Sequence, residues 1–146
     1  MRPARARAAP RREVEAGIQR AIVQALCLAL PPGSIVHHSP NEQRGHDRRA
    51  RVRQAILKGM GVEAGFADLI VLSDRLALML EVKSARGQQS DDQKKMEARA
   101  RVHAHGYAVV RSVEDALAAC LAVGMRVRMR CAAQGPPGAP RDGSGP

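Results

Sequence analysis

Two apolar runs, at residues 69–72 and 76–80, constrain the fold of this chain most strongly, because only three polar residues separate them. Each run has the length and composition of a buried strand. The break between the runs, Ser73-Asp74-Arg75, predicts a tight antiparallel hairpin with Asp74 and Arg75 at its turn. This hairpin is the most hydrophobic segment of the sequence, so we expect it to lie at the centre of a sheet.

The register of this hairpin places three charged residues at one of its ends. Asp68 falls opposite Glu81, where facing Cβ atoms lie about 4.5–5.5 Å apart, and alternation puts Lys83 on the face of Glu81 with Val82 on the other. Facing carboxylates repel each other unless a cation lies between them. Mg²⁺ suits such a pair, and a lysine beside it orients water or stabilises negative charge. Strands often end in solvated charges, so Glu81 and Lys83 alone would more often have a purely structural role, and it is the register match with Asp68 that favours a site.

Helical and strand-like patterns surround the hairpin on both sides. Their order predicts one α/β domain with a small mixed central sheet flanked by helices. We expect helices at 13–30, 46–58, 90–105 and 113–123, and further strands at 34–39, 106–112 and 126–130. Ser112 is the expected N-cap of the last helix, and Asp115 completes its capping box.

Charge and aromatic content restrict the partners of this chain. The formal net charge is +10 over 146 residues, which is typical of proteins that bind a polyanion such as nucleic acid, although it also serves solubility. Phe66 and Tyr107 are the only aromatic residues among Phe, Tyr and Trp. Modules that read single strands by stacking bases on several aromatic rings are therefore excluded.

The cysteines and the chain ends indicate the compartment and the domain limits. The three cysteines have no metal-knuckle spacing, and Cys27 and Cys120 fall in helical patterns that predict buried thiols. We expect no disulfide framework and a cytoplasmic location. No apolar run reaches the roughly 20 residues that span a bilayer, so no membrane partner is expected. We expect a disordered basic arm at 1–11, the domain at 12–131 and a disordered Pro/Gly-rich tail at 132–146.

Four stretches in a fixed order resemble a known family. They are "HHSPNEQRG", "KGMGVEAGFADLIVL", "LEVKSARGQQSDDQ" and "GYAVVRSVEDA". Together they resemble the VRR-NUC family, the virus-type replication-repair nuclease branch of the PD-(D/E)XK superfamily, over about residues 13–123. One departure is Ala67, where the family commonly has proline before the aspartate. The resemblance implies a restriction-endonuclease-like core and phosphodiester cleavage that depends on Mg²⁺ or Mn²⁺.

The resemblance also assigns roles to individual residues. It implies metal ligation by Glu15, Asp68, Glu81 and the carbonyl of Val82, and catalytic roles for Asp68, Glu81, Lys83 and Gln93. Residues 15 and 19, from the stretch "EAGIQ", share one helix face because they are four apart. Two of these positions suit structural roles as well: position 15 suits a first-turn acid favoured by the helix dipole, and position 93 suits a capping-box partner of Ser90.

Basic side chains on two expected helices flank the charged end of the hairpin in sequence. Such clusters suit phosphate contacts, which position a duplex without reading its sequence. His37 and His38 alternate between strand faces and have no partner with metal-site spacing, so a zinc site is not expected. The candidate DNA-binding residues are Gln19, His38, Asn41, Arg48, Arg49, Arg51, Arg53, Lys58, Arg86 and Lys94. Glu42 is a further candidate contact, and Lys95, Arg99 and Arg101 extend the second basic cluster.

Together these features predict a metal-dependent, structure-selective DNA endonuclease. The family resemblance implies branched or four-way junction DNA as substrate and a homodimer as the active form. A basic, non-enzymatic DNA-binding accessory protein with the same fold is the main alternative, and cleavage of RNA is another. The full set Glu15, Asp68, Glu81 and Lys83 favours the enzyme.

Overall fold

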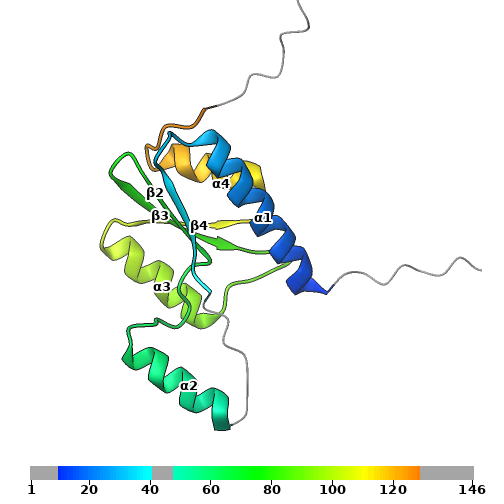
Figure 1. Cartoon of the computed structure of the whole chain (residues 1–146), viewed down its shortest axis with the longest axis vertical. Helices are drawn as coiled ribbons and strands as arrows, with labels where there is room; N and C mark the ends of the chain where they lie inside the picture. The colour runs from blue at the N-terminus through cyan, green and yellow to red at the C-terminus, as the bar shows by residue number, and fades with distance from the viewer. Residues whose placement is uncertain (1–9, 41–47, 129–146) are drawn as a thin grey trace, which may run out of the picture.

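The computed structural model describes residues 10–40 and 48–128 of the 146-residue chain. The described residues form an α/β fold, with a small mixed sheet flanked by helices, as predicted (Figure 1). The elements are α1 (Arg11–Ala29), β1 (Ile35–His38), α2 (Arg48–Gly59), β2 (Leu69–Ser73), β3 (Leu76–Val82), α3 (Asp91–Val102), β4 (Gly106–Val110) and α4 (Val113–Ala122).

The hairpin of β2 and β3 forms the middle of the sheet, whose strand order is β1-β2-β3-β4. β1 and β3 pair with β2 in antiparallel fashion, and β4 pairs with β3 in parallel. The predicted register is confirmed, because Val71 pairs with Leu78 and Ser73 pairs with Leu76. Asp74 and Arg75 have φ angles of 54° and 64°, as both central residues of a two-residue hairpin turn require.

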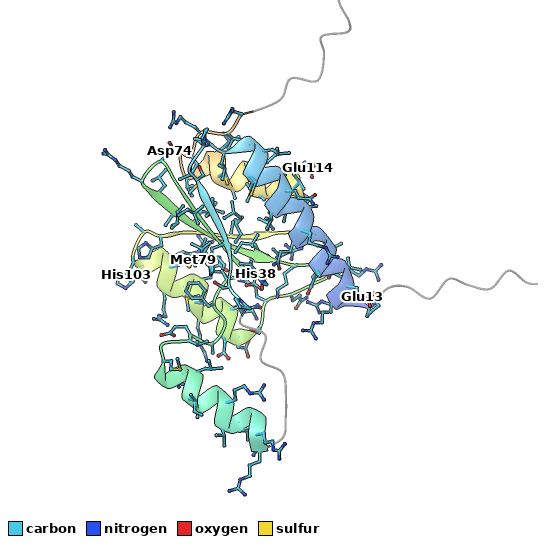
Figure 2. All side chains as sticks on the ribbon, viewed as in Figure 1. Glu13, His38, Asp74, Met79, His103 and Glu114 are labelled. Carbon is cyan, nitrogen blue, oxygen red and sulfur yellow. The ribbon has the colours of Figure 1, made fainter. Side chains whose placement is uncertain are left out.

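Strand alternation divides the sheet into an apolar face and a face that becomes polar at one end. Side chains of β2 and β3 such as Val71 and Leu80 pack with Ile22 and Leu26 of α1 and with Cys120 of α4. α1 and α4 lie side by side over this face, and α3 lies on the other side of the sheet (Figure 1). Residues of the opposite parity, including Met79 and Glu81, point toward the α3 side, where Met79 is labelled in Figure 2.

The predicted edge strand at 126–130 is wrong for the residues that the structure describes. Residues 125–128 have no strand structure. The Asp74 carboxylate in the hairpin turn instead accepts hydrogen bonds from the backbone N–H of Arg126, at 2.9 Å, and from its guanidinium, at 2.6 and 3.0 Å. The N–H of Arg128 donates to the carbonyl of Ala29 at 2.7 Å. Residues 126–128 are thus held between the β2–β3 turn and the end of α1, and they do not pair with a strand of the sheet.

Three smaller expectations are also corrected. Arg11 was assigned to the disordered arm, but α1 begins at this residue. Cys27 was expected to be buried; it is exposed because it projects away from the buried stripe that includes Ile22 and Leu26. Ser112 does cap α4, but the Asp115 carboxylate accepts the N–H of Arg111, at 2.8 Å, and not that of Ser112. The expected arm at 1–9, the tail at 132–146 and Cys131 lie outside the described residues.

α2 lies at one end of the molecule, beyond α3 (Figure 1). None of its described side chains is buried, which sets it apart from the other three helices of the described residues. The loop after α2 is fixed to α3, because Arg99 pairs with Glu63 at 2.9 Å and Gly65 lies against the first turn of α3. Among the residues described, no helix is long and apolar enough to cross a membrane.

Gly65 is required where the loop after α2 meets the start of α3. Its φ is +71°, and a Cβ there would overlap the carbonyl of Asp92 and lie 2.6 Å from the nitrogen of Gln93. We predict that Gly65→Ala lowers the free energy of unfolding by about 3 kcal/mol, from left-handed backbone strain and steric overlap together. Urea denaturation followed by circular dichroism measures this loss.

Gly61→Ala is the matched control for this prediction. Gly61 has a φ of +90°, but no atom lies within 4 Å of a Cβ added there. This variant therefore carries only the backbone strain, and we expect a loss of about 1 kcal/mol. Equal losses for the two variants would show that Gly65 is not needed for the contact with α3.

Candidate active site

Asp68 and Glu81 meet at the end of the β2–β3 hairpin, as the predicted register requires. Asp68 directly precedes β2, and its Oδ2 accepts the backbone N–H of Val82 at 2.8 Å. The carbonyl of Asp68 accepts the N–H of Ser39, which extends the β1–β2 pairing by one residue. Hydrogen bonds with the backbone of Val82 and of Ser39 therefore position Asp68. The negative charge of Asp68 raises the pKa of Glu81.

Glu81 is the most constrained group of the site because its side chain is fully buried, with 0% exposure. Its Oε1 accepts a hydrogen bond from Lys83 Nζ at 2.8 Å and another from Gln93 Nε2. Its Oε2 is buried and accepts no hydrogen bond from any residue that the structure describes. In the ionised form of Glu81, a buried oxygen without a donor is destabilising, by about 1–3 kcal/mol or more. This oxygen therefore marks a position that a ligand could fill.

Burial controls the ionisation of Glu81. Removal from water raises the pKa of this carboxyl, and the hydrogen bond and charge of Lys83 oppose the rise. The negative charge of Asp68, and the hydrogen bond that the protonated Glu81 makes with it, add to the rise. The result is a pKa of about 7. In the absence of further positive charge, Glu81 therefore holds its proton through much of the range below neutral pH.

Gln93 joins the start of α3 to this carboxylate. Its Oε1 accepts the N–H of Ser90 at 2.8 Å, and the Ser90 hydroxyl accepts the N–H of Gln93, which together make a capping box. Its Nε2 donates to Glu81. The two roles that the sequence allowed for Gln93, a capping partner and a site residue, are thus both compatible with its geometry.

Glu15 fixes the loop that follows Lys83. Its Oε1 accepts hydrogen bonds from the Ser84 N–H at 3.0 Å, from the Ser84 hydroxyl at 3.2 Å and from Arg11 Nε at 3.0 Å. Burial by itself raises the pKa of Glu15, but these hydrogen bonds outweigh it and hold the pKa below its usual value. Gly87 belongs to the same contact, because a Cβ there would lie 2.9 Å from Glu15 Oε1.

One open cleft of about 1110 Å³ collects the candidate residues from distant parts of the chain. Eight residues singled out from the sequence line it: Glu15, Gln19, His38, Asp68, Glu81, Val82, Lys83 and Gln93. His38 lies at the end of β1, near the centre of the view in Figure 2. The sequence predicted the members of this cleft on α1, β1, the hairpin and α3, and the fold brings them together.

Three arginines of α1 that were not predicted from the sequence also line the cleft: Arg11, Arg12 and Arg20. Arg12, Gln19 and Arg20 lie within an arc of about 100° around the helix, so they share one face. This placement could have identified the two arginines. The basic character of the preceding arm instead led to Arg11 being grouped with it.

The remaining basic candidates lie outside the cleft. These residues are Arg48, Arg49, Arg51, Arg53 and Lys58 on α2, Arg86 in the loop after β3, and Lys94 on α3. Asn41, Glu42 and His46 lie outside the described residues.

The cations of α3 do not form a purely positive surface, because each one is paired with an acid. These pairs are Lys94 with Asp91, Lys95 with Asp92, Arg99 with Glu63 and Arg101 with Glu97.

The donor set fits a hard divalent cation in part. Oxygen donors from Asp68 and Glu81, with the Val82 carbonyl beside them, are the type that Mg²⁺ and Mn²⁺ prefer, and Glu81 Oε2 accepts no hydrogen bond from the described residues. In the described part of the chain, however, no three His, Cys, Asp or Glu side chains form a group that could hold a metal ion. Glu15 thus lies in the same cleft without completing a three-acid cluster.

Comparison with known proteins identifies a shared fold. A solved structure described as a "VRR_NUC domain protein" superimposes with a TM-score of 0.52 over 82% of this chain and 91% of that chain, at 16% sequence identity. The resemblance stated from the sequence motifs is thereby confirmed for the fold. No family model matches the sequence, and no curated protein matches it.

The raised pKa of Glu81 predicts how stability depends on pH in metal-free buffer. Between its ordinary pKa of 4.5 and its folded value of about 7, the folded chain keeps a proton that the unfolded chain releases. Stability is therefore highest below this window and falls as pH rises through it, by on the order of 3 kcal/mol. We expect Glu81→Gln to remove this loss, as measured by chemical denaturation with EDTA from pH 4.5 to 8.

Glu114→Gln is the control for this pH series, because Glu114 is an exposed carboxylate on α4 that does not line the cleft. Its free energy of unfolding should fall with pH as steeply as that of the wild type. The same slope in Glu81→Gln and in the wild type would contradict the assignment of the raised pKa to Glu81.

Proposed function

We propose that this protein is a metal-dependent endodeoxyribonuclease. The observation that carries the proposal is the environment of Glu81. This buried carboxylate faces Asp68, contacts Lys83 and has one oxygen that accepts no hydrogen bond from the described residues, inside a cleft lined by arginines. A shared fold with a protein whose description contains "VRR_NUC" supports the same class of activity.

Asp68, Glu81 and the Val82 carbonyl would hold Mg²⁺ or Mn²⁺ in this function. When bound, such a metal lowers the pKa of water and stabilises charge on a phosphate. It would also favour the ionised form of Glu81, whose pKa of about 7 reflects burial without that charge. The acids thus supply hard oxygen donors at the end of a rigid hairpin.

Lys83 has a separate role in this proposal. Its Nζ is held 2.8 Å from Glu81 Oε1, and only 8% of the residue is exposed. An ammonium fixed beside the carboxylates can orient water or stabilise negative charge that develops on the phosphate. Gln93, through its hydrogen bond to Glu81, would keep the carboxylate in the orientation that leaves Oε2 toward the ligand.

The cleft and the net charge support DNA as the substrate. The arginines of α1 line one wall of the cleft, and the chain carries a net charge of +10, both of which favour phosphate contacts. The basic clusters suit phosphate contacts that do not read base sequence, and the sequence has no zinc-finger spacing. We therefore propose recognition of DNA structure, with branched or four-way junction DNA as substrate. A homodimer, which would place two such sites on two strands, belongs to the same proposal.

A non-enzymatic DNA-binding protein is the second candidate. Glu15 favours it, because its Oε1 is engaged with Ser84 and Arg11, and no group of three acids is formed in the described residues. In that case Lys83 and Gln93 would serve only to neutralise a buried structural carboxylate. Binding that depends steeply on salt, without loss of substrate, is the expected behaviour of such a protein.

Cleavage of labelled DNA distinguishes the two candidates. We expect nicking of a four-way junction or a flap with Mg²⁺ or Mn²⁺, little cutting of a plain duplex, and none with EDTA. Lys83→Ala should reduce the rate by at least about 100-fold, because it removes the positioned ammonium. Lys95→Ala is the matched control, since Lys95 is exposed, pairs with Asp92 and lies outside the cleft.

The folded state of Lys83→Ala is checked by its binding to the same DNA in EDTA. Tight binding by the wild type without cutting, under every metal condition, would contradict the nuclease proposal and favour the accessory protein. Preferential cutting of an RNA substrate of the same shape would support phosphodiester hydrolysis but show that RNA, not DNA, is the substrate.

A further inference from the structure

α2 and the turn after it carry an exposed apolar stripe. Val52 is 54% exposed, Ile56 58% and Met60 75%. These residues are spaced by four, so they form one row along the helix. Large apolar side chains that form a continuous exposed row on an otherwise polar helix commonly mark an interaction surface.

The segment that follows this stripe is anchored beside the cleft. The chain leaves the cleft at Pro40 and returns to it at Gly65, and α2 lies between these two points. The ion pair of Glu63 with Arg99 and the packing of Gly65 against α3 anchor the returning segment. α2 extends beyond α3 at the end of the molecule (Figure 1). Gly65 follows Met60 by only five residues, so the end of the stripe lies within roughly 18 Å of the edge of the cleft, and a long polymer in the cleft can reach it.

The charges on α2 identify the chemistry of its partner. Residues 48–59 contain five cations and no acid. At about 100° per residue, Arg48, Arg49 and Arg53 lie within about a quarter turn of Ile56, beside the apolar stripe. A second copy of this chain, seated α2 against α2, would bring these like charges together. A polyanion with apolar surfaces between its charges is complementary to such a helix.

Nucleic acid at a branch has both features. Phosphates there lie next to base faces that are exposed where stacking is interrupted, and apolar side chains such as Ile and Met insert at such steps. Stacking on aromatic rings is not available on α2, because Phe66 and Tyr107 both lie outside it. Contacts of α2 with bases are therefore left to its aliphatic side chains and its arginine guanidinium groups.

We propose that the stripe of Val52, Ile56 and Met60 packs against the exposed base faces of branched or interrupted DNA, while the adjacent arginines hold its phosphates. The stripe thereby supplies selectivity for DNA structure, whereas the cleft supplies the chemistry. This inference rests on the proposed function for its substrate class, but it concerns binding and does not require cleavage.

The test compares two affinities in EDTA, where no cutting occurs. Fluorescence anisotropy measures the dissociation constants for a four-way junction and for a plain duplex of the same total length. We expect the triple variant Val52→Gln/Ile56→Gln/Met60→Gln to lose about tenfold of the wild-type preference for the junction, with an unchanged salt dependence, because the phosphate contacts remain. 2-Aminopurine placed at the branch should change its fluorescence with the wild type and not with the variant.

Two further variants act as controls. Leu28→Gln/Val102→Gln removes apolar side chains that are 79% and 80% exposed on α1 and α3, and it should keep the preference for the junction. Arg49→Gln/Arg53→Gln should weaken binding to both DNAs and reduce the salt dependence. Thermal melting checks that all variants fold, which the exposure of these side chains leads us to expect.

Three results would overturn the inference. One is an unchanged junction preference in the triple variant, or no preference in the wild type. Another is that the wild type binds vesicles of phosphatidylcholine and phosphatidylserine and the triple variant does not, while both prefer the junction equally. That result would assign α2 to a membrane surface. The third is that the triple variant differs from the wild type in oligomeric state, measured by sedimentation, while both prefer the junction equally. That result would make the stripe a contact with a second copy of the chain. Absence of cleavage would contradict only the nuclease proposal.

Discussion

The burial of Glu81 is the interaction on which the candidate site depends. A carboxylate removed from water is costly unless positive charge and hydrogen-bond donors surround it. Lys83 and Gln93 supply these donors to Oε1, but no described residue supplies one to Oε2. The fold thus maintains an incompletely satisfied acid beside the charge of Asp68, a combination that burial and like-charge repulsion both disfavour. Such an arrangement is characteristic of sites that bind or react.

The apolar framework makes this burial possible. Leu69, Val71, Leu78 and Leu80 pack on one face with α1 and α4, so the register of the hairpin is strongly specified. That register alone brings Asp68 opposite Glu81. The capping box of α3 then aims Gln93 at the carboxylate, and the loop after Lys83 is held by Glu15. Core packing, helix capping and loop anchoring all converge on one end of the sheet.

The sequence predicted the elements of this centre well because their signals are local. Alternation of apolar residues and a two-residue turn determine the hairpin register, and helical spacing placed Glu15 and Gln19 on one face. The failures concern contacts between distant segments. In the described part of the strand expected at 126–130, residues 126–128 instead make hydrogen bonds with Asp74 and Ala29, which no local pattern reveals. Among the acids that pair with the α3 cations, only Glu63 is distant in sequence, and its pairing with Arg99 emerges only from the fold. The other three pairs follow the spacing of three or four residues along one helix, which the sequence does show.

The roles that we propose for the cleft and for α2 rest on these contacts. Oxygen donors are rigidly placed at the end of the hairpin, while cations and exposed apolar groups lie on a helix outside the core. The central claim is that Glu81 Oε2 binds a divalent metal. Diffraction from crystals soaked in Mn²⁺, recorded at a wavelength with strong manganese anomalous scattering, tests it most directly. The account predicts one anomalous peak at bonding distance from Glu81 Oε2 and Asp68. A cleft without a peak, in a protein that nevertheless cuts DNA with Mn²⁺, would contradict it.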